Sequence, residues 1–159
     1  MSKPEQATRS ILEAAIKGDL AALEAAVAQG GRIDGRDPEH DQSALFLAVM
    51  FGRAAVAGYL VRSGANVNDR DDQQRTPLMV ASIKTAPLLI ENGADRDARD
   101  VTGATALIKA ATRCDRDMIR LLLSYGANAG LKTNDGQTAV DIAEEFGLTD
   151  VVEQVRRIS

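Results

Sequence analysis

The sequence predicts an all-α solenoid of stacked helix–turn–helix units joined by short, exposed, hairpin-like turns. Gly-Ala-Asn or Gly-Ala-Asp recurs along the chain after a weaker Gly-Gly, and the glycines at 30, 64, 93 and 126 are spaced by 34, 29 and 33 residues. Residues suited to open a helix recur in phase with them, at Ser43, Thr76, Thr105 and Thr138. A fixed period near 33 residues is typical of a stacked repeat array.

The stretch from Gly64 to Leu78 shows how one unit is built. A helix is expected to end at Gly64, because glycine adopts the left-handed conformation that closes helices. Thr76 and Pro77 then open the next helix, since threonine caps free N–H groups and proline suits the first helical position. The residues between them are polar and contain too few apolar side chains to be buried.

These residues carry a resemblance to a known family. Thr76–Pro77–Leu78 followed by Ala81, the run Gly64-Ala65-Asn66-Val67-Asn68 and the run from Thr105 to Ala111 resemble the ankyrin repeat. The resemblance covers about residues 10 to 157 and implies one ankyrin-repeat domain, 1–159, with a turn and two antiparallel helices per repeat. The expected repeats are about 10–34, 35–68, 69–97, 98–130 and 131–157, with the third shortened.

The first repeat is expected to lack a full turn, as a capping repeat does. Residues 1–9 are predicted to form a loose lead or a first helical turn. A helix from Ser10 to Ile16 follows, because Ser10 and Glu13 have the spacing of a capping box. Gly18–Asp19 ends that helix, and a second helix is expected over 20–29.

The second, fourth and fifth repeats are expected to be regular pairs of helices. Their predicted helices cover 43–51 and 54–63, 105–112 and 115–125, and 138–146 and 149–157. The last helix has a polar outer face, which is what a terminal repeat requires. We therefore expect the array to be complete at five repeats.

The third repeat is expected to be irregular, because it is four residues shorter than the period of 33. Its inner helix is predicted from Thr76 to Lys84. Proline is tolerated only in the first turn of a helix, so the outer helix that contains Pro87 is expected to be brief. We expect a local dent in the array at this repeat.

Composition excludes several classes of protein. A net charge of −4 disfavours nucleic-acid binding, which needs a concentrated basic surface. No apolar run approaches the roughly 20 residues that span a membrane, and the polar N-terminus does not resemble a signal peptide. A single cysteine fits a reducing compartment. Aromatic residues make up 3% of the chain, which argues against an aromatic-lined ligand pocket. We expect a cytoplasmic protein that is monomeric alone.

The sequence predicts no enzyme site, cofactor site or metal site. His40 and Cys114 lie about two repeats apart, so they are not expected to form a dyad. Asp69, Asp71 and Asp72 suggest a cation loop but lack the glycine and glutamate of a calcium site, so we interpret them as a solvated turn. Cys114 stands where the resemblance predicts a glycine between helices. Its basic neighbours favour a reactive thiolate, which keeps a redox role as an alternative.

The resemblance implies that a partner binds to the turn tips and to the exposed side of the inner helices. We carried this surface over residue by residue. The predicted partner-binding residues are Met50, Phe51, Arg70, Asp72, Gln73, Arg75, Lys84, Arg99, Val101, Thr102, Thr112, Arg113 and Tyr125. His40 is expected to be a surface turn residue, with partner contact as its alternative role.

Two groups within this surface stand out, and each has a second interpretation. Met50 and Phe51 are large apolar residues at a position that is usually exposed, which is typical of interface hot spots. Alternatively, they tuck under the longer first turn. The basic residues of repeats three and four suit carboxylate recognition, but interleaved aspartates would equally pair with them in solvent.

The sequence therefore predicts a non-catalytic module that binds one protein partner of unknown identity, as an adaptor, a sequestering factor or an inhibitor. The alternatives are a small-molecule, metal or redox-linked role and, third, nucleic-acid binding. Four residues depart from the histidine that the family often places after Thr-Pro-Leu, namely Phe46, Met79, Ile108 and Asp141. These departures weaken the expectation of regular hydrogen bonding between successive turns.

Overall fold

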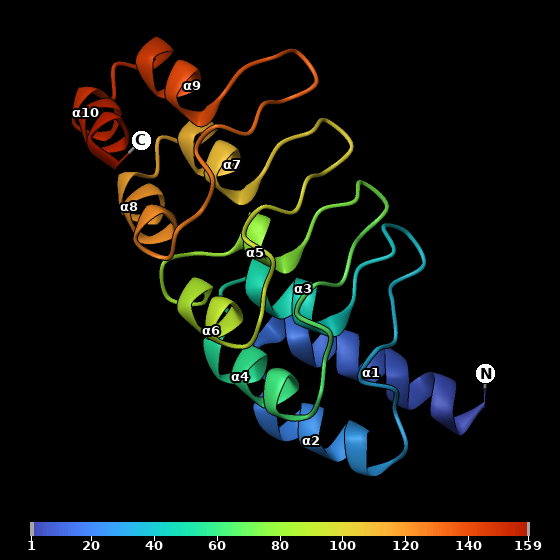
Figure 1. Ribbon diagram of the computed structural model, residues 1–159. Helices are drawn as coiled ribbons and strands as arrows, with labels where there is room; N and C mark the ends of the chain where they lie inside the picture. The colour runs from blue at the N-terminus through green and yellow to red at the C-terminus, as the bar shows by residue number, and fades with distance from the viewer. Residues whose placement is uncertain (1, 159) are drawn as a thin grey trace. The chain divides into compact units, whose positions relative to one another are not determined.

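A computed structural model describes residues 2–158, and every regular element within them is an α-helix. This confirms the predicted all-α fold. Isolated β-bridges pair Arg36 with Ser43 and Lys132 with Thr138 in two of the turns. The chain divides into two compact units, Met1–Ala94 and Asp95–Ser159 (Figure 1). None of the described helices combines the length and the apolar character needed to cross a membrane.

Unit 1 contains two layers of helices. α1, α3 and α5 form the inner layer, in which α3 packs against both of its neighbours, and α2, α4 and α6 form the outer layer. The interior between the layers is filled by fully buried side chains such as Ile11, Leu23, Phe46 and Leu60. The six helices are α1 Lys3–Lys17, α2 Leu20–Ala28, α3 Ala44–Met50, α4 Ala54–Arg62, α5 Pro77–Val80 and α6 Ala86–Glu91.

Unit 2 repeats this arrangement with two helix pairs. α7 packs against α8 and α9, and α10 packs against both α8 and α9. Leu107, Met118, Ile119 and Leu122 are buried between the helices. The four helices are α7 Ala106–Thr112, α8 Arg116–Ser124, α9 Ala139–Glu145 and α10 Thr149–Ile158.

The first helix begins earlier than predicted. α1 starts at Lys3 rather than near Ser10, because Ser2 and Glu5 form a capping box in which each side chain accepts a backbone N–H of the other. Pro4 lies in the first turn, where its missing N–H costs nothing. Ser10 is inside the helix and donates its hydroxyl to the Gln6 carbonyl. Residues 3–9 are therefore helix and not a loose lead.

The predicted inner helix of the third repeat is also wrong in length. α5 ends at Val80 instead of continuing to Lys84, since Ala81 is extended with φ −66° and ψ 151°. The chain then turns at Ser82, whose carbonyl accepts the N–H groups of Thr85 and Ala86. The third repeat is four residues shorter than the others mainly because its inner helix is shorter. α6 is brief, as predicted, and holds Pro87 in its first turn.

Three of the four predicted helix-opening residues act as caps. The hydroxyls of Ser43, Thr105 and Thr138 accept the N–H groups of Phe46, Ile108 and Asp141. Thr76 occupies the cap position of α5, but its buried hydroxyl has no hydrogen-bond partner in the described part of the chain. The Met79 N–H that would reach this hydroxyl donates to the Thr76 carbonyl instead, at 3.0 Å.

Replacing Thr76 by valine is therefore expected to stabilise the protein. A buried hydroxyl without a partner carries a desolvation penalty, and valine has the same shape without it, so Thr76→Val should add about 1 kcal/mol to the free energy of unfolding. The matched change Thr105→Val removes a cap and should subtract about 1 kcal/mol. Urea unfolding of both variants measures this, and destabilisation by Thr76→Val would contradict the analysis.

Cys114 occupies a backbone conformation that glycine adopts elsewhere in the chain. Its φ is +55°, and Gly147, which stands at the equivalent turn between α9 and α10, has φ +67°. A side chain in this left-handed region is strained, because its Cβ approaches the following carbonyl oxygen. The resemblance had placed a glycine at this position, and the conformation agrees with it.

We expect Cys114→Gly to raise the free energy of unfolding by about 0.5–1 kcal/mol, because relief of strain exceeds the added chain entropy of the unfolded state. Gly147→Ala should lower it by about 1 kcal/mol, although a Cβ there meets no neighbouring atom within 4 Å. Chemical denaturation of the two variants provides the comparison. Equal stability of Cys114→Gly and the parent chain would argue against strain at this turn.

Candidate partner-binding surfaces

The second hairpin of unit 1 is organised by Asp71. Its side chain is completely buried, and one carboxylate oxygen accepts the N–H groups of Gln73 at 3.0 Å and Arg75 at 2.8 Å. The other oxygen pairs with the Arg75 guanidinium at 2.6 Å. The interpretation as a solvated turn is therefore wrong for Asp71, which is the internal acceptor that closes the hairpin, whereas Asp72 is exposed.

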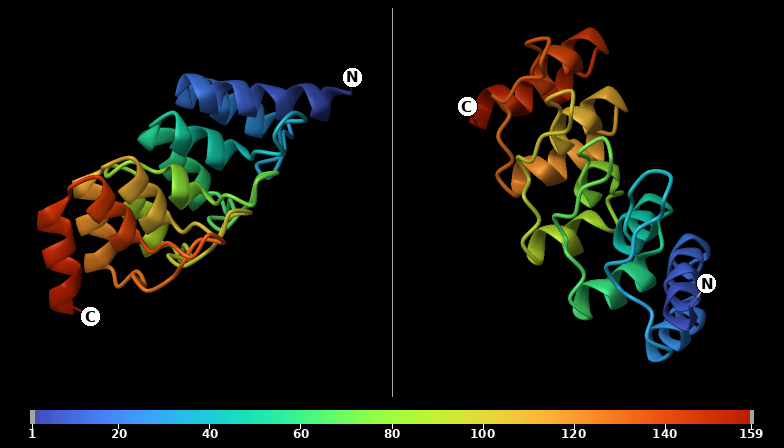
Figure 2. Two further views of the ribbon diagram at one scale, coloured as in Figure 1. Left: turned by 90° about the horizontal axis from the view of Figure 1, so that it is seen from above. Right: turned by 90° about the vertical axis from the view of Figure 1, so that its right-hand side faces the viewer.

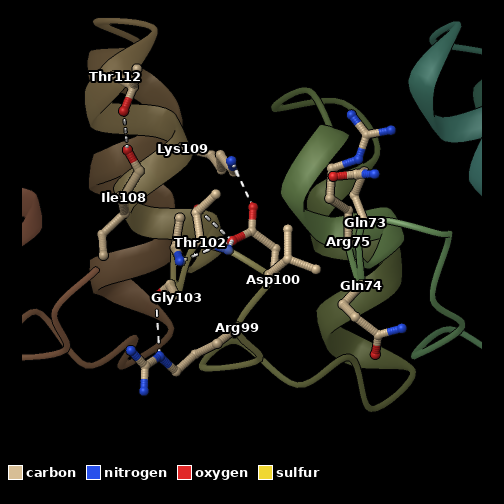
Figure 3. Close-up of polar contacts among 12 residues, drawn as sticks. Gln73, Gln74, Arg75, Arg99, Asp100, Thr102, Gly103, Ile108, Lys109 and Thr112 are labelled. Atoms are coloured by element: carbon tan, nitrogen blue, oxygen red, sulfur yellow. Dashed lines mark hydrogen bonds and ion pairs between the residues drawn. The ribbon is translucent and has the colours of Figure 1, made fainter. Parts of the chain in front are cut away.

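Asp100 has the same role in unit 2 (Figure 3). Its Oδ1 accepts the N–H groups of Thr102 and Ala104, at 2.9 and 3.0 Å, and the Thr102 hydroxyl at 2.6 Å. Its Oδ2 pairs with the Lys109 ammonium at 2.7 Å. Burial acts to raise the pKa of Asp100, but the bonds from Lys109, Thr102 and Ala104 outweigh it, so the pKa lies below its ordinary value.

Sequence reasoning missed this set of acceptors, although a signal for it exists. Asp37 accepts the N–H groups of Glu39, His40 and Gln42, and the Thr133 hydroxyl accepts that of Gln137. These hairpin-opening positions follow the period of the glycines. They are Asp37, Asp71, Asp100 and Thr133.

Within each unit, neighbouring hairpins are hydrogen-bonded to one another. In unit 1 the Asp72 N–H donates to the His40 carbonyl at 3.1 Å. In unit 2 the Asn134 N–H donates to the Thr102 carbonyl at 2.9 Å, and its side chain donates to the Val101 carbonyl at 2.9 Å. Bonding between turns is therefore present despite the departures from the family pattern.

Arginines at the base of the hairpins extend these links. Arg36 donates to the Arg70 carbonyl at 2.7 Å and pairs with Asp69, both in the next hairpin. Arg99 donates to the Gly103 carbonyl in its own hairpin and to the Lys132 carbonyl in the next, at 3.1 and 2.7 Å. The guanidinium groups therefore help to hold the turns in place.

The structure gives the predicted binding residues of unit 1 two different environments. Met50 and Phe51 end α3 with exposed side chains, and Asp72 and Gln73 form an exposed hairpin tip. Lys84 is exposed too, but it lies in the turn before α6 and not at a helix end. The other two are engaged internally, namely Arg70, which donates to the Gln74 carbonyl, and Arg75, which pairs with Asp71 and covers the Phe46 ring.

The predicted residues of unit 2 divide in the same way. Val101 lies at a hairpin tip with 51% of its surface exposed, and Thr112 and Arg113 are exposed at the end of α7. Tyr125 follows α8 and is half-buried, and its carbonyl accepts a bond from Arg96. The two remaining residues are Arg99 and Thr102, whose side chains bond within the hairpins.

Unit 1 also contains a groove that sequence reasoning did not predict. It has a volume of about 980 Å³ and lies between α1, the first hairpin and the end of α3, where Met50 and Phe51 form part of its lining. The interpretation that these two residues tuck under the first turn is wrong, because their side chains line an open surface, while their role in an interface stays a prediction. We call this feature the α1 groove.

The His, Cys, Asp and Glu side chains of the described residues bear on a metal site and on a His40–Cys114 pair. No cluster of three or more His, Cys, Asp or Glu side chains there is arranged to hold a metal ion. His40 lies at a hairpin tip with its Nδ1 3.9 Å from an Asp72 oxygen, whereas Cys114 is exposed between α7 and α8.

Comparison with known proteins places this fold in context. Residues 11–100 and 82–156 match the family described as ankyrin repeats (3 copies). The human ankyrin repeat and SOCS box protein 6 is 33% identical over 84% of this chain and 35% of its own length. A putative ankyrin repeat-containing protein of Treponema pallidum is 37% identical over 64% of this chain and 36% of its own. The Xenopus laevis neurogenic locus notch homolog protein 1 is 33% identical over 78% and 5%. The chain thus spans about a third or less of these relatives.

The low pKa of Asp100 makes stability depend on pH. Its carboxylate favours the folded state at pH values above the ordinary aspartate pKa of about 3.9, and this contribution is lost as the pH falls through the lower pKa of the folded state. Asp100→Asn should therefore cost about 2 kcal/mol at pH 7 and reduce the loss of stability between about pH 5 and pH 2. Urea unfolding at several pH values tests this, with the exposed Asp135→Asn as the control. An unchanged pH profile for Asp100→Asn would contradict it.

Proposed function

Since the chain belongs to the ankyrin-repeat family, we propose that it is a non-catalytic module that binds one partner protein through its hairpin tips and the ends of its inner helices. Ankyrin repeats are in general protein-interaction modules. We include in the proposal that the module is cytoplasmic and monomeric when free, in keeping with its single cysteine and net charge of −4.

The observation that carries this proposal is that the backbone and the tip side chains of a hairpin have different roles. The backbone is closed from inside by an acceptor such as Asp71 or Asp100, while tip side chains such as Gln73 and Val101 remain exposed. Association is weakened when loops must be ordered on binding. A tip whose backbone is already hydrogen-bonded avoids much of that cost, so these hairpins suit recognition of a protein surface.

The partner's identity decides between the possible roles. A module that covers a partner's active site is an inhibitor, one that withholds the partner is a sequestering factor, and one that joins two proteins is an adaptor. A small-molecule, metal or redox-linked role is the alternative to protein binding. It requires a stoichiometric ligand in the purified protein, which mass spectrometry under native conditions would detect.

Affinity capture from host lysate tests the proposed surface. The bait is the parent chain or a tip variant carrying Gln73→Arg and Val101→Glu, and the control carries Ala21→Glu and Ala25→Arg on the exposed face of α2, with the same net charge. We expect one protein to be retained by the parent and the control, and to bind the tip variant at least about tenfold more weakly. Circular dichroism confirms that each bait is folded.

Two results would contradict the proposal. Equal retention of the captured protein by the tip variant would remove the hairpin tips from the binding surface. Absence of any specific protein, with a bound small molecule or metal in the purified chain, would favour the alternative.

A further inference from the structure

We propose that the α1 groove binds an amphipathic helix of a partner protein, one whose apolar face is flanked by lysine or arginine. The inference rests on the proposed function and adds to it the chemistry of the bound segment. The groove lies wholly within unit 1.

One wall of the groove is α1, whose first half is fastened to the first hairpin. The Arg32 N–H donates to the Thr8 hydroxyl at 3.1 Å. Gly35 is buried against the same residue, and a Cβ on Gly35 would overlap the Thr8 side chain. Figure 2 shows the N-terminal end of α1 beside this hairpin in both views. The wall is therefore held in place by contacts between segments more than twenty residues apart.

Part of this wall lies outside the residues that match the family. The family match begins at residue 11, whereas Pro4, Glu5, Thr8 and Arg9 of the groove lining precede it. α1 is 15 residues long, about 22 Å, so the groove offers a wall as long as a four-turn helix.

The lining concentrates exposed apolar surface. Ile16, Met50 and Phe51 are 38%, 37% and 45% exposed, and they are three of the six large hydrophobic side chains exposed among the described residues. Leu12 and Leu47 lie beneath them in the same lining. Contiguous exposed apolar surface marks interaction sites, and aromatic side chains dominate the energy of such interfaces. A helix with apolar residues on one stripe is the shape that such a groove accepts.

Charged residues on the rim of the groove determine which charge the flanks of the bound helix should carry. Every arginine that lines the groove is paired with an acid of this chain, since Arg9 contacts Glu13, Arg32 contacts Asp34, and Arg36 contacts Asp41 and Asp69. Within the described residues, three lining acids make no ion pair, namely Glu5, Asp37 and Glu39.

Asp37 is occupied by the hairpin N–H groups, and its pKa lies below the ordinary value because their bonds outweigh the effect of burial. Glu39 on the hairpin wall and Glu5 on the α1 wall are both exposed, and although the Glu5 carboxylate also accepts the Ser2 N–H, neither is paired with a cation among the described residues. The groove is an apolar surface with a negative rim, which complements a helix that carries positive charge beside its apolar stripe.

The test uses three fluorescein-labelled peptides of about 15 residues. The first has leucines at i, i+3, i+4 and i+7 with lysine flanks, the second has the same stripe with glutamate flanks, and the third is the first in scrambled order. Fluorescence anisotropy should show the lysine peptide binding about tenfold more tightly than either of the others.

Matched variants localise that binding. Phe51→Asp should abolish it, whereas Phe146→Asp should leave it unchanged, because Phe146 follows α9 as Phe51 follows α3 but lies in unit 2. Glu5→Gln combined with Glu39→Gln should weaken the lysine peptide about fivefold and reduce its preference over the glutamate peptide. Glutamine preserves the capping box at Ser2, so α1 stays folded.

Three outcomes would overturn the inference. The first is equal affinity for the three peptides, and the second is peptide binding that survives Phe51→Asp. The third is a concentration-dependent dimer in sedimentation that Phe51→Asp abolishes, because a second copy of the chain would then occupy the groove. If lysate capture depends on the hairpin tips while the peptides fail to bind, the inference falls and the proposed function stands. If the peptides bind as expected and no protein is captured, the proposed function is the one that fails.

Discussion

A side-chain acceptor at the start of each hairpin, buried at Asp71 and Asp100, is the interaction on which the rest of this molecule depends. A short turn has several backbone N–H groups and few residues with which to satisfy them, and Asp71 and Asp100 do so with a single carboxylate each. Removing that carboxylate from water is costly unless a cation pairs with it, and Arg75 and Lys109 provide the pairing. The positions of the helices that follow are set by turns closed in this way.

This internal closure also separates two kinds of surface. The hairpin tips present exposed side chains, most of them polar, on a backbone that is already hydrogen-bonded. The α1 groove presents larger apolar side chains between elements that are fixed to one another through Thr8, Arg32 and Gly35. Tips of the first kind suit polar selectivity, and a groove of the second kind suits the burial of apolar area, so the two surfaces would contribute different parts of the binding free energy.

Sequence reasoning succeeded where the structural signal is local. Caps such as Ser43 and Thr105 act within one turn of their own helix, so the period of these residues located most of the helices. The capping box of Ser2 and Glu5 was equally local, but the same spacing between Ser10 and Glu13 placed the predicted start of the helix about seven residues too late. The end of α5 was misplaced because Ala81 continues a helical pattern, while the shortened connection to α6 requires an extended residue there.

The missed parts of the candidate site depend on contacts that sequence spacing does not encode. An aspartate in a polar turn is usually solvated, and only the folded hairpin shows that Asp71 is turned inward. The α1 groove arises because Thr8 meets Gly35, two residues that no periodicity links. In contrast, the exposure of Met50 and Phe51 followed from their place at the end of a short helix.

The left-handed backbone position in each hairpin bears on how the tip surface changes over evolutionary time. The left-handed position of the hairpin tip is filled by Asp41 and Gln74 in unit 1 and by Gly103 and Gly136 in unit 2. The acceptor inside each hairpin holds the turn whether this position carries a side chain, as in unit 1, or a glycine, as in unit 2. Recognition at the tips is therefore free to diversify almost independently of folding, and a library randomised at tip residues while retaining Asp71, Arg75, Asp100 and Lys109 would sample new specificities on an intact scaffold.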